Sequence, residues 1–313
     1  MSTRNRAIAE GRRGSAAMDA TPDRIDAYAC ERIASQLKRI VGLQADVLED
    51  RDPEPLHQLR VSLRRLRCVL LQFEPFLVLP SGATPRRVGR MCAKLGLARD
   101  LDVLQELVGS SFAEMLGPQA SEELAPLRKA LSRERRRAAE EMKQSLRSTA
   151  YLKVIARLQR WLREPSTRPA ASMPLQAWID ELIMPWLPPL WLHPSWTLDP
   201  LEHPQELHSL RGRIRRCRYM IENLEPICSA PLSAHLQRFK TLQDILGQLH
   251  DLQVFDSLVE DARINLSARQ TTTVLQLSHQ RQENLAAQWR LQSRRMLRSS
   301  QRKVLIRRLT TPR

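Results

Sequence analysis

The chain has 313 residues, and its hydrophobic content of 42% lets one or two domains bury a core, which excludes disorder along the whole chain. Its 50 lysines and arginines against 34 acidic residues give a net charge of +16, which favours an anionic partner: nucleic acid, an anionic membrane surface or a smaller polyphosphorylated ligand. No run of about 18 apolar residues occurs, so we expect no membrane-spanning helix and no membrane partner. Because the N-terminus lacks the apolar run of a signal peptide and the five cysteines form no CxxC pair, we expect a cytoplasmic protein.

The first elements follow from helix-start and helix-stop signals. Residues 1–21 are interpreted as a disordered basic tail, and a helix is expected over about 22–48. Asp52 is the expected N-cap of a second helix with Pro53 at its first position, and Pro75 marks its end. The ten glycines are few, and the long segments are rich in Leu, Ala, Arg, Gln and Glu, so we expect an all-α fold.

The segment of this second helix occurs twice. Residues 53–76 (PEPLHQLRVSLRRLRCVLLQFEPF) and 204–227 (PQELHSLRGRIRRCRYMIENLEPI) are identical at 10 of 24 positions without a gap, at an offset of 151 residues. A second block, LGLARDLDV at 95–103, recurs as LGQLHDLQV at 246–254 with the same offset. Two motifs in register at one offset indicate an internal duplication of a helical unit.

Later segments divide the chain into two halves. Helices are expected at about 121–148, 150–163 and 268–300. Between the halves, a stretch rich in Pro, Ser and Ala is typical of a linker. The expected boundaries are a first helical half at 22–164, the linker at 165–175, a second helical half at 176–300 and a solvated basic tail at 301–313.

The segment 178–200 stands where the first helix of the second half is expected. Its prolines between residues 185 and 194 predict a short or kinked helix, or a loop in its place. Four tryptophans in the segment predict a packed apolar pad, in the core or at a dimer contact, rather than a ligand site. These residues are Trp178, Trp186, Trp191 and Trp196.

Each repeated helix carries two stripes when it is drawn at 100° per residue. The core stripe of the first copy consists of Leu56, Leu59, Leu63, Leu66 and Leu70. Beside it lies a basic stripe of His57, Arg60, Arg64 and Arg67. The basic stripe of the second copy consists of His208, Arg211, Arg215 and Arg218.

These basic stripes are interpreted as an anion-binding surface rather than a solvated face. A solvated helix face normally mixes charges of both signs, but no acidic residue occurs between positions 57 and 73. Arginine forms paired hydrogen bonds with phosphate oxygens and stays charged at physiological pH. Each histidine lies near a helix N-terminus, where the helix dipole also favours an anion.

The pattern His-x-x-Arg-x-x-x-Arg-Arg-x-Arg, present twice and followed each time by a Leu-Gly block, resembles the CHAD family (conserved histidine α-helical domain) over roughly residues 22–300. The resemblance implies two pseudo-symmetric helical bundles packed around a basic central channel that binds inorganic polyphosphate. Carried over by position, it implies that both basic stripes bind polyphosphate, together with Lys94 and Lys240. Further candidates for this channel are Arg65, Arg90, Arg99, Arg213, Arg216 and Arg238.

The sequence offers no motif for chemistry. It contains no P-loop, no GxSxG and no HExxH or CxxC spacing, so we expect no catalytic residues, no metal site and no cofactor. Three aspartates of the Leu-Gly blocks are expected to cap helices or to pair with a nearby arginine rather than to act in catalysis. These are Asp100, Asp102 and Asp251.

Three functional classes are therefore compared. The leading hypothesis is non-enzymatic binding of polyphosphate, which would recruit the protein and its partners to polyphosphate granules or regulate polyphosphate enzymes. General nucleic-acid binding is an alternative that the net charge favours, although an aromatic content of 4% leaves little for base stacking. The third is a non-catalytic subunit of an enzyme that metabolises polyphosphate.

Overall fold

The computed structural model describes residues 23–117, 122, 124–228, 230–260 and 266–311, and the tail expected at 1–21 lies outside this part of the chain. Its helices are α1 (Ile25–Glu49), α2 (Pro53–Gln72), α3 (Pro85–Lys94), α4 (Gly96–Leu107), α5 (Ala113–Leu116), α7 (Ala125–Arg147), α8 (Thr149–Trp161), α9 (Ile179–Ile183), α10 (Leu187–Trp191), α11 (Pro204–Leu224), α12 (Ser233–Glu260), α13 (Ala268–Met296) and α14 (Ser299–Thr310). Shorter elements are the π-helix η1 (Val108–Phe112) and the 3₁₀ turns η3 (Pro169–Ser172), η4 (Leu175–Trp178), η5 (Pro194–Trp196) and η6 (Glu225–Ile227). The described residues form no strand, and the predicted all-α fold is confirmed.

The predicted start of the repeated helix is confirmed in both copies. In α2 the Asp52 side chain accepts a hydrogen bond of 2.8 Å from the backbone N–H of Glu54, and Pro53 occupies the first helical position. α11 also begins with a proline, Pro204, but the side chain of His203 before it forms no capping hydrogen bond. The preceding helix, expected from residue 22, begins instead at Ile25.

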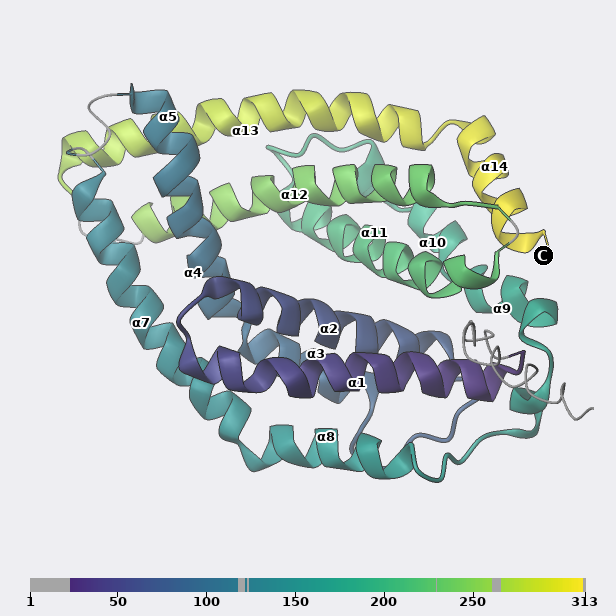
Figure 1. The fold of residues 1–313 in the computed structure, drawn as a ribbon. Coiled ribbons are helices and arrows are strands. Elements are labelled where there is room, and N and C mark those ends of the chain that lie inside the picture. The colour runs from purple at the N-terminus through teal and green to yellow at the C-terminus, as the bar shows by residue number, and fades with distance from the viewer. Residues whose placement is uncertain (1–22, 118–121, 123, 229, 261–265, 312–313) are drawn as a thin grey trace, which may run out of the picture.

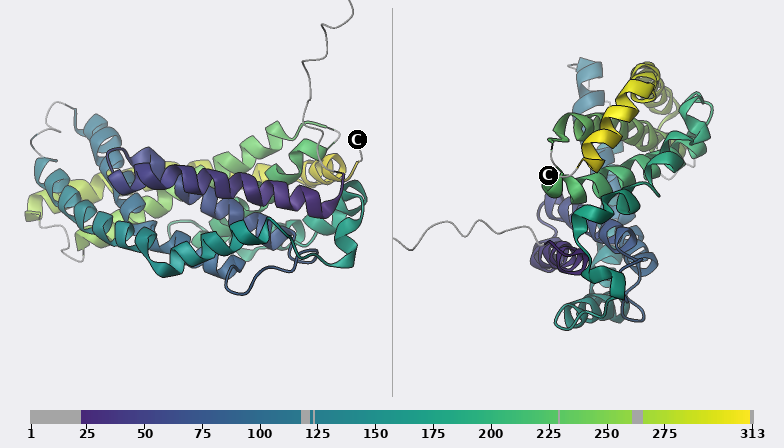
Figure 2. Two further views of the ribbon diagram at one scale, coloured as in Figure 1. Left: turned by 60° about the horizontal axis from the view of Figure 1, so that its bottom comes forward. Right: turned by 90° about the vertical axis from the view of Figure 1, so that its right-hand side faces the viewer.

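The helices form two stacked groups (Figures 1 and 2). In Figure 1 the lower group contains α1, α2, α3 and α8, and the upper group contains α11, α12 and α13. α4 and α7 contact each other and lie at the left end of both groups, and α4 also contacts α12. α2 and α11, which carry the repeated sequence, pack against each other where the two groups meet.

The linker expected at 165–175 is held by backbone hydrogen bonds to the first half. The N–H of Val78 donates to the carbonyl of Ser166 at 3.0 Å, and the N–H of Arg168 donates to the carbonyl of Phe76 at 2.9 Å. Near the end of the linker, the N–H of Ile25 donates to the carbonyl of Met173 at 3.2 Å. The linker is therefore part of the packed structure of the first half.

The proline-rich segment 178–200 folds as predicted into short pieces, α9, α10 and η5. Its tryptophans pack against the core, as expected. Trp196 is 5% exposed and stacks on Trp289 of α13, with ring centroids 5.5 Å apart. Trp178 meets the ring of Phe76 edge-on at 5.7 Å, so this segment joins the two groups of helices.

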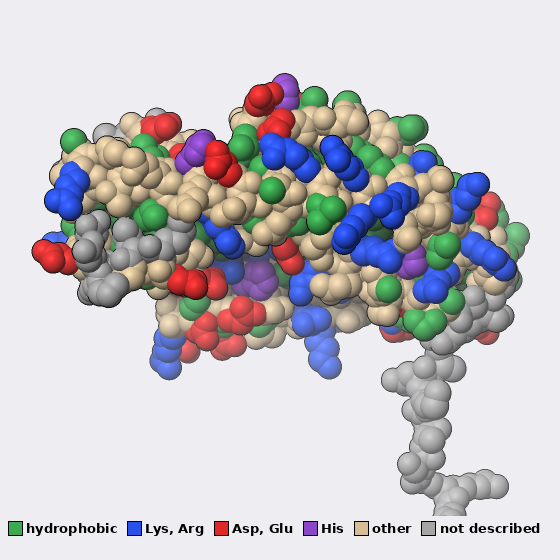
Figure 3. All heavy atoms as spheres, turned by 90° about the horizontal axis from the view of Figure 1, so that it is seen from above, with side chains coloured by type: hydrophobic (Ala, Val, Ile, Leu, Met, Phe, Trp, Pro, Cys, Tyr) green, Lys and Arg blue, Asp and Glu red, His purple; other side chains and the backbone are tan. Residues whose placement is uncertain are grey.

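The C-terminal residues differ from the solvated tail expected at 301–313. Up to Thr310 they belong to α14, which contacts α9 and buries Leu305 and Leu309. Two leucines four residues apart lie on one face of a helix, which is enough to attach this basic segment to the core. Figure 3 shows lysine and arginine side chains gathered over the right-hand end of the molecule, where α14 lies.

The two Leu-Gly blocks adopt different backbone structures. The first block lies at the junction of α3 and α4, where Leu95 separates the two helices before Gly96 starts the second of them. Its counterpart, Leu246-Gly247, lies inside the continuous helix α12.

Along the described residues, no helix is long and apolar enough to cross a membrane.

Candidate functional site

The basic stripes of α2 and α11 face one cavity, which we call the α2/α11 cavity. It has a volume of about 460 Å³ and is also bounded by α4 and α12. The leucine stripe of α2 lies in the core as predicted, and this burial turns the neighbouring basic stripe toward the cavity. In Figure 3 a histidine lies beside basic side chains in a recess near the middle of one face.

The cavity brings together six of the eight predicted stripe residues. α2 contributes His57, Arg60 and Arg64, and α11 contributes His208, Arg211 and Arg215. Arg99 of α4, one of the further candidates, lines the same cavity. Five arginines from three helices are therefore gathered around one space, although the α2 and α11 stripes are 151 residues apart in the sequence.

Most of these arginines have no carboxylate at ion-pair distance. Arg60 lies 3.8 Å from Asp100. Within the described ranges, no ion pair reaches Arg64, Arg211 or Arg215. Burial, together with the like charges of Arg64 and Arg211, lowers the pKa of Arg215 to about 10. The cavity therefore holds excess positive charge, which an anion would stabilise.

Each Leu-Gly glycine makes room for an arginine of the same half. A Cβ atom added at Gly96 would lie 3.1 Å from an Nη atom of Arg60. At Gly247 it would lie 3.3 Å from an Nη atom of Arg211. At both positions a guanidinium lies close to the helix backbone, so a Cβ atom would push it aside by a few tenths of an ångström. This packing explains why glycine recurs at the offset that separates the two arginines.

Three histidines line the cavity, and burial lowers the pKa of each. Arg99 adds to this effect at His57, and Arg211 adds to it at His208. The ring of His250 lies 4.5 Å from the ring of His208, and burial next to Arg211 lowers the pKa of His250 to about 4. Burial also raises the pKa of Asp251, on the same wall, to about 6.

The structure places the last arginine of each stripe outside the cavity. The guanidinium of Arg67 packs on α3, where a Cβ added at Gly89 would lie 3.1 Å from its central carbon. Arg218 pairs with Glu222 at 2.8 Å within α11, and Arg65 of α2 reaches the same carboxylate at 2.7 Å. Glu222 thus joins α2 to α11, and its single negative charge is shared by two of the predicted residues.

The other predicted residues lie on different surfaces. Lys94 and Arg90 line a separate pocket between α3 and α8. Arg216 lies over the ring of Trp186 at 5.8 Å, and Arg238 hydrogen-bonds to Gln301 of α14. Lys240 and Arg213 are exposed and are not among the described residues that line the α2/α11 cavity.

Several polar residues of the cavity wall were not among those predicted from the sequence. His250 was missed although it lies 151 residues after Arg99, so the two residues occupy the same position in their Leu-Gly blocks. This offset was the signal that could have identified it. Asp244 and Gln248 of α12 have no such signal, because only the packing of α12 beside α11 brings them to the cavity.

The model of the CHAD domain family matches residues 31–260. The chain belongs to the CHAD domain family. The crystal structure of the CHAD domain from the plant Ricinus communis is similar to it with a TM-score of 0.65 and 22% identity, over 97% of this chain and 98% of that one. PptA from Streptomyces chartreusis is similar with a TM-score of 0.63 and 17% identity, over 87% and 99%. At these identities the likeness supports the fold, and no curated protein matches the chain.

The acidic residues of this CHAD domain pair with arginines, as expected for two of the three aspartates considered above. Asp102 pairs with Arg135, which also contacts Asp50 at 2.7 Å, and Asp100 lies near Arg60. In the described ranges, no group of three or more His, Cys, Asp or Glu side chains is placed to hold a metal ion. What the cavity offers is a concentration of guanidinium groups.

Proposed function

We propose that the α2/α11 cavity of this CHAD domain binds inorganic polyphosphate and does not hydrolyse it. The observation that carries the proposal is the convergence of five arginines on one cavity, four of them without an ion pair among the described residues. Polyphosphate presents one negative charge after another along an unbranched chain. Two arginine stripes from facing helices offer matching charges on two sides of such a chain.

The composition of the cavity wall supports polyphosphate over nucleic acid. None of the described residues that line the cavity is Phe, Tyr or Trp, so bases have no large ring to stack on. Gln243, Gln248 and three histidines add hydrogen-bonding groups around the arginines. A ligand made only of phosphate groups uses all of these contacts and brings no base that must be accommodated.

Calorimetry of the full chain with long-chain polyphosphate tests the proposal. The variant Arg64→Ala/Arg215→Ala removes two unpaired charges from the cavity, and we expect its affinity to fall at least about a hundredfold, because each lost charge-assisted contact costs roughly tenfold or more. The matched control is Arg133→Ala/Arg137→Ala, which removes two exposed charges from α7. Its affinity is expected to stay within about threefold of the wild type.

Two results would contradict specific binding in the cavity. One is an equal loss of affinity in both double variants, which would mean that polyphosphate responds only to overall charge. The other is easy displacement of polyphosphate by single-stranded DNA of equal charge, which would favour the nucleic-acid alternative. Binding should weaken steeply between about 50 and 200 mM salt in the wild type, because counterions are released.

The absence of hydrolysis is tested separately. The protein is incubated with polyphosphate and Mg²⁺, and free phosphate is measured; release above the level of the Arg64→Ala/Arg215→Ala variant would show an enzyme.

For the cellular role, we propose recruitment to polyphosphate granules and to the proteins bound there. A fluorescent fusion should mark granules, and the double variant should be diffuse while the α7 control variant still marks them.

A further inference from the structure

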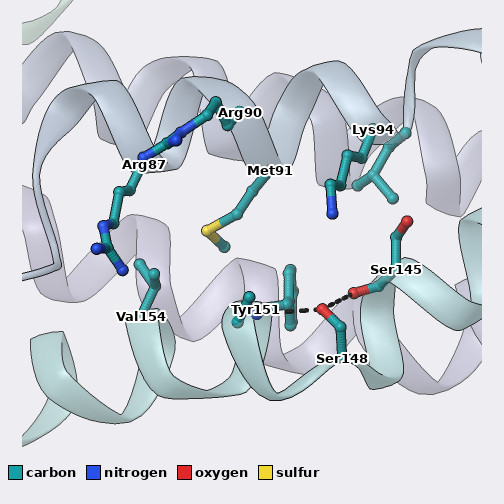
Figure 4. A pocket seen from close by; sticks show the side chains of 10 residues that line it. Arg87, Arg90, Met91, Lys94, Ser145, Ser148, Tyr151 and Val154 are labelled. Atoms are coloured by element: carbon teal, nitrogen blue, oxygen red, sulfur yellow. Dashed lines mark hydrogen bonds between the residues drawn. The ribbon is translucent and has the colours of Figure 1, made fainter.

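A second pocket lies on the opposite side of α3 from the arginines of α2. Its volume is about 290 Å³, and α3, the end of α7 and the start of α8 form its walls (Figure 4). Gly89 and Cys92 of α3 face Arg67 and Arg60, whereas Met91 and Lys94 face this pocket. The pocket is therefore separate from the α2/α11 cavity, and we call it the α3/α8 pocket.

One end of the α3/α8 pocket is built for an anion. Lys94 extends toward Ser145 and Ser148, as Figure 4 shows. Ser148 separates α7 from α8, and its hydroxyl caps α8 by accepting a hydrogen bond of 3.3 Å from the N–H of Tyr151. The first turn of α8 thus opens on the pocket with free backbone N–H groups and the positive end of the helix dipole.

The rest of the pocket is apolar. Met91 points from α3 toward Tyr151, and Val154 lies further along α8 (Figure 4). These three side chains are 8%, 3% and 3% exposed. The Tyr151 hydroxyl is buried without a hydrogen-bond partner in the described ranges, and burial raises its pKa to about 12, so it stays protonated. Tyr151 therefore carries an unused buried donor on a residue that lines the pocket.

The charges at the rim all have one sign. Arg87 and Arg90 accompany Lys94, and none of the described residues that line the pocket is acidic. None of the three forms an ion pair with a described residue. Arg87 lies beside Val154 at the end of the pocket away from Lys94 (Figure 4). An anionic group at the Lys94 end therefore meets attraction along the whole rim.

We propose that the α3/α8 pocket binds a small organic anion, in which an apolar or aromatic group is joined to a phosphate or carboxylate. The anionic group lies between Lys94 and the start of α8, and the apolar group covers Met91, Tyr151 and Val154. Polyphosphate has no apolar part, so the two sites select different ligands. This proposal does not depend on what the α2/α11 cavity binds.

Ligand-detected NMR with phenyl phosphate tests the pocket. We expect transfer of saturation from the protein to the ring protons, and binding at least tenfold tighter than that of inorganic phosphate or phenol. Lys94→Ala should weaken the affinity for phenyl phosphate about tenfold or more, because a charge-assisted contact is lost. Lys153→Ala removes an exposed lysine from α8 outside the pocket and should leave the affinity unchanged within about twofold.

A second variant and a competition make the outcome decisive. Ala150 is exposed and lines the pocket, so Ala150→Phe fills the space without disturbing the core and should abolish binding. Phenyl phosphate should stay bound when polyphosphate is added to saturation. The variant Arg64→Ala/Arg215→Ala should also still bind phenyl phosphate. Displacement by polyphosphate would place phenyl phosphate in the α2/α11 cavity and overturn the proposal. Equal binding of phenyl phosphate to wild type and Ala150→Phe, or no binding at all, would also overturn it.

Discussion

The side chains of Gln72 and Asn223 are hydrogen-bonded to each other, with Asn223 Nδ2 donating to Gln72 Oε1 at 3.0 Å. The two residues occupy the same position in the two copies of the repeated helix, 151 residues apart, and both are buried. Gln72 Nε2 also donates to the carbonyl of Met220 at 3.2 Å. These polar contacts fix how the C-terminal ends of α2 and α11 lie against each other.

Asn223→Ala is expected to lower the free energy of unfolding by about 2 kcal/mol, because Gln72 Oε1 then stays buried without a donor. Chemical denaturation measures the change. Gln237→Ala, at an exposed position of α12, is the control and should change the free energy by less than about 0.5 kcal/mol. Equal effects of the two substitutions would show that the contact between the copies adds nothing.

Glu222→Gln should lower the free energy of unfolding by about 2 kcal/mol, because Arg65 and Arg218 lose the carboxylate that joins them across α2 and α11. The loss should shrink when Arg65 is also replaced by Met, and a double-mutant cycle measures this coupling. Glu141→Gln on the exposed face of α7 is the matched control. A coupling of zero between positions 65 and 222 would contradict the contact.

Gly247→Ala should weaken the affinity for polyphosphate about tenfold, because the new methyl group displaces the Arg211 guanidinium that lies 3.3 Å from its position. Gly212→Ala is the control, since a Cβ there meets nothing within 4 Å. That control should stabilise α11 by about 0.5–1 kcal/mol and leave binding unchanged. Calorimetry and thermal unfolding separate the two effects, and unchanged binding in Gly247→Ala would be evidence against a role for Arg211.

Polyphosphate binding should tighten as the pH falls from about 7 to 5. Arginines and burial lower the pKa values of His57 and His208 in the free protein, and a bound polyanion favours their charged forms. It also favours protonation of Asp251, whose pKa is already raised to about 6 by burial. The complex therefore holds more protons than the free protein, so affinity increases as protons become available.

Titrations at about pH 6.5 in two buffers of different ionisation enthalpy give the number of protons taken up. His57→Asn/His208→Asn should reduce that number. His279→Gln should not, because His279 lies on the exposed surface of α13 beside Glu283. Proton release on binding in the wild type would contradict the assignment of these histidines to the site.

Sequence periodicity predicted the orientation of α2 and α11 because burial of one leucine stripe leaves only one direction for the arginines beside it. The same reasoning did not predict the different contacts of Arg67 and Arg218, which have equivalent positions in the two helices. Four residues after Arg67 comes Leu71, whereas four residues after Arg218 comes Glu222. The partner of Arg65 could not be predicted, since only the packing of α2 on α11 brings it to Glu222.

Short elements were harder to predict than long ones. Lys94 was assigned to the polyphosphate site because it precedes a Leu-Gly block, but it lies on the face of α3 that lines the α3/α8 pocket, and the opposite face packs on arginines of α2. The helix of residues 299–310 was missed because its two buried leucines are surrounded by basic residues, a composition that is typical of a tail. In both cases the deciding contacts come from helices distant in the sequence.

The close approach of Gly96 to Arg60 and of Gly247 to Arg211 has a consequence for how CHAD sequences change over evolution. A side chain at either glycine position competes for space with the facing arginine, so the guanidinium must shift or the arginine must be shortened or lost. Among relatives of this chain, substitutions at positions 60 and 96 should therefore occur together, and so should those at 211 and 247. A change confined to one half would leave its wall with one arginine fewer, while the wall of the other half keeps both of its stripe arginines.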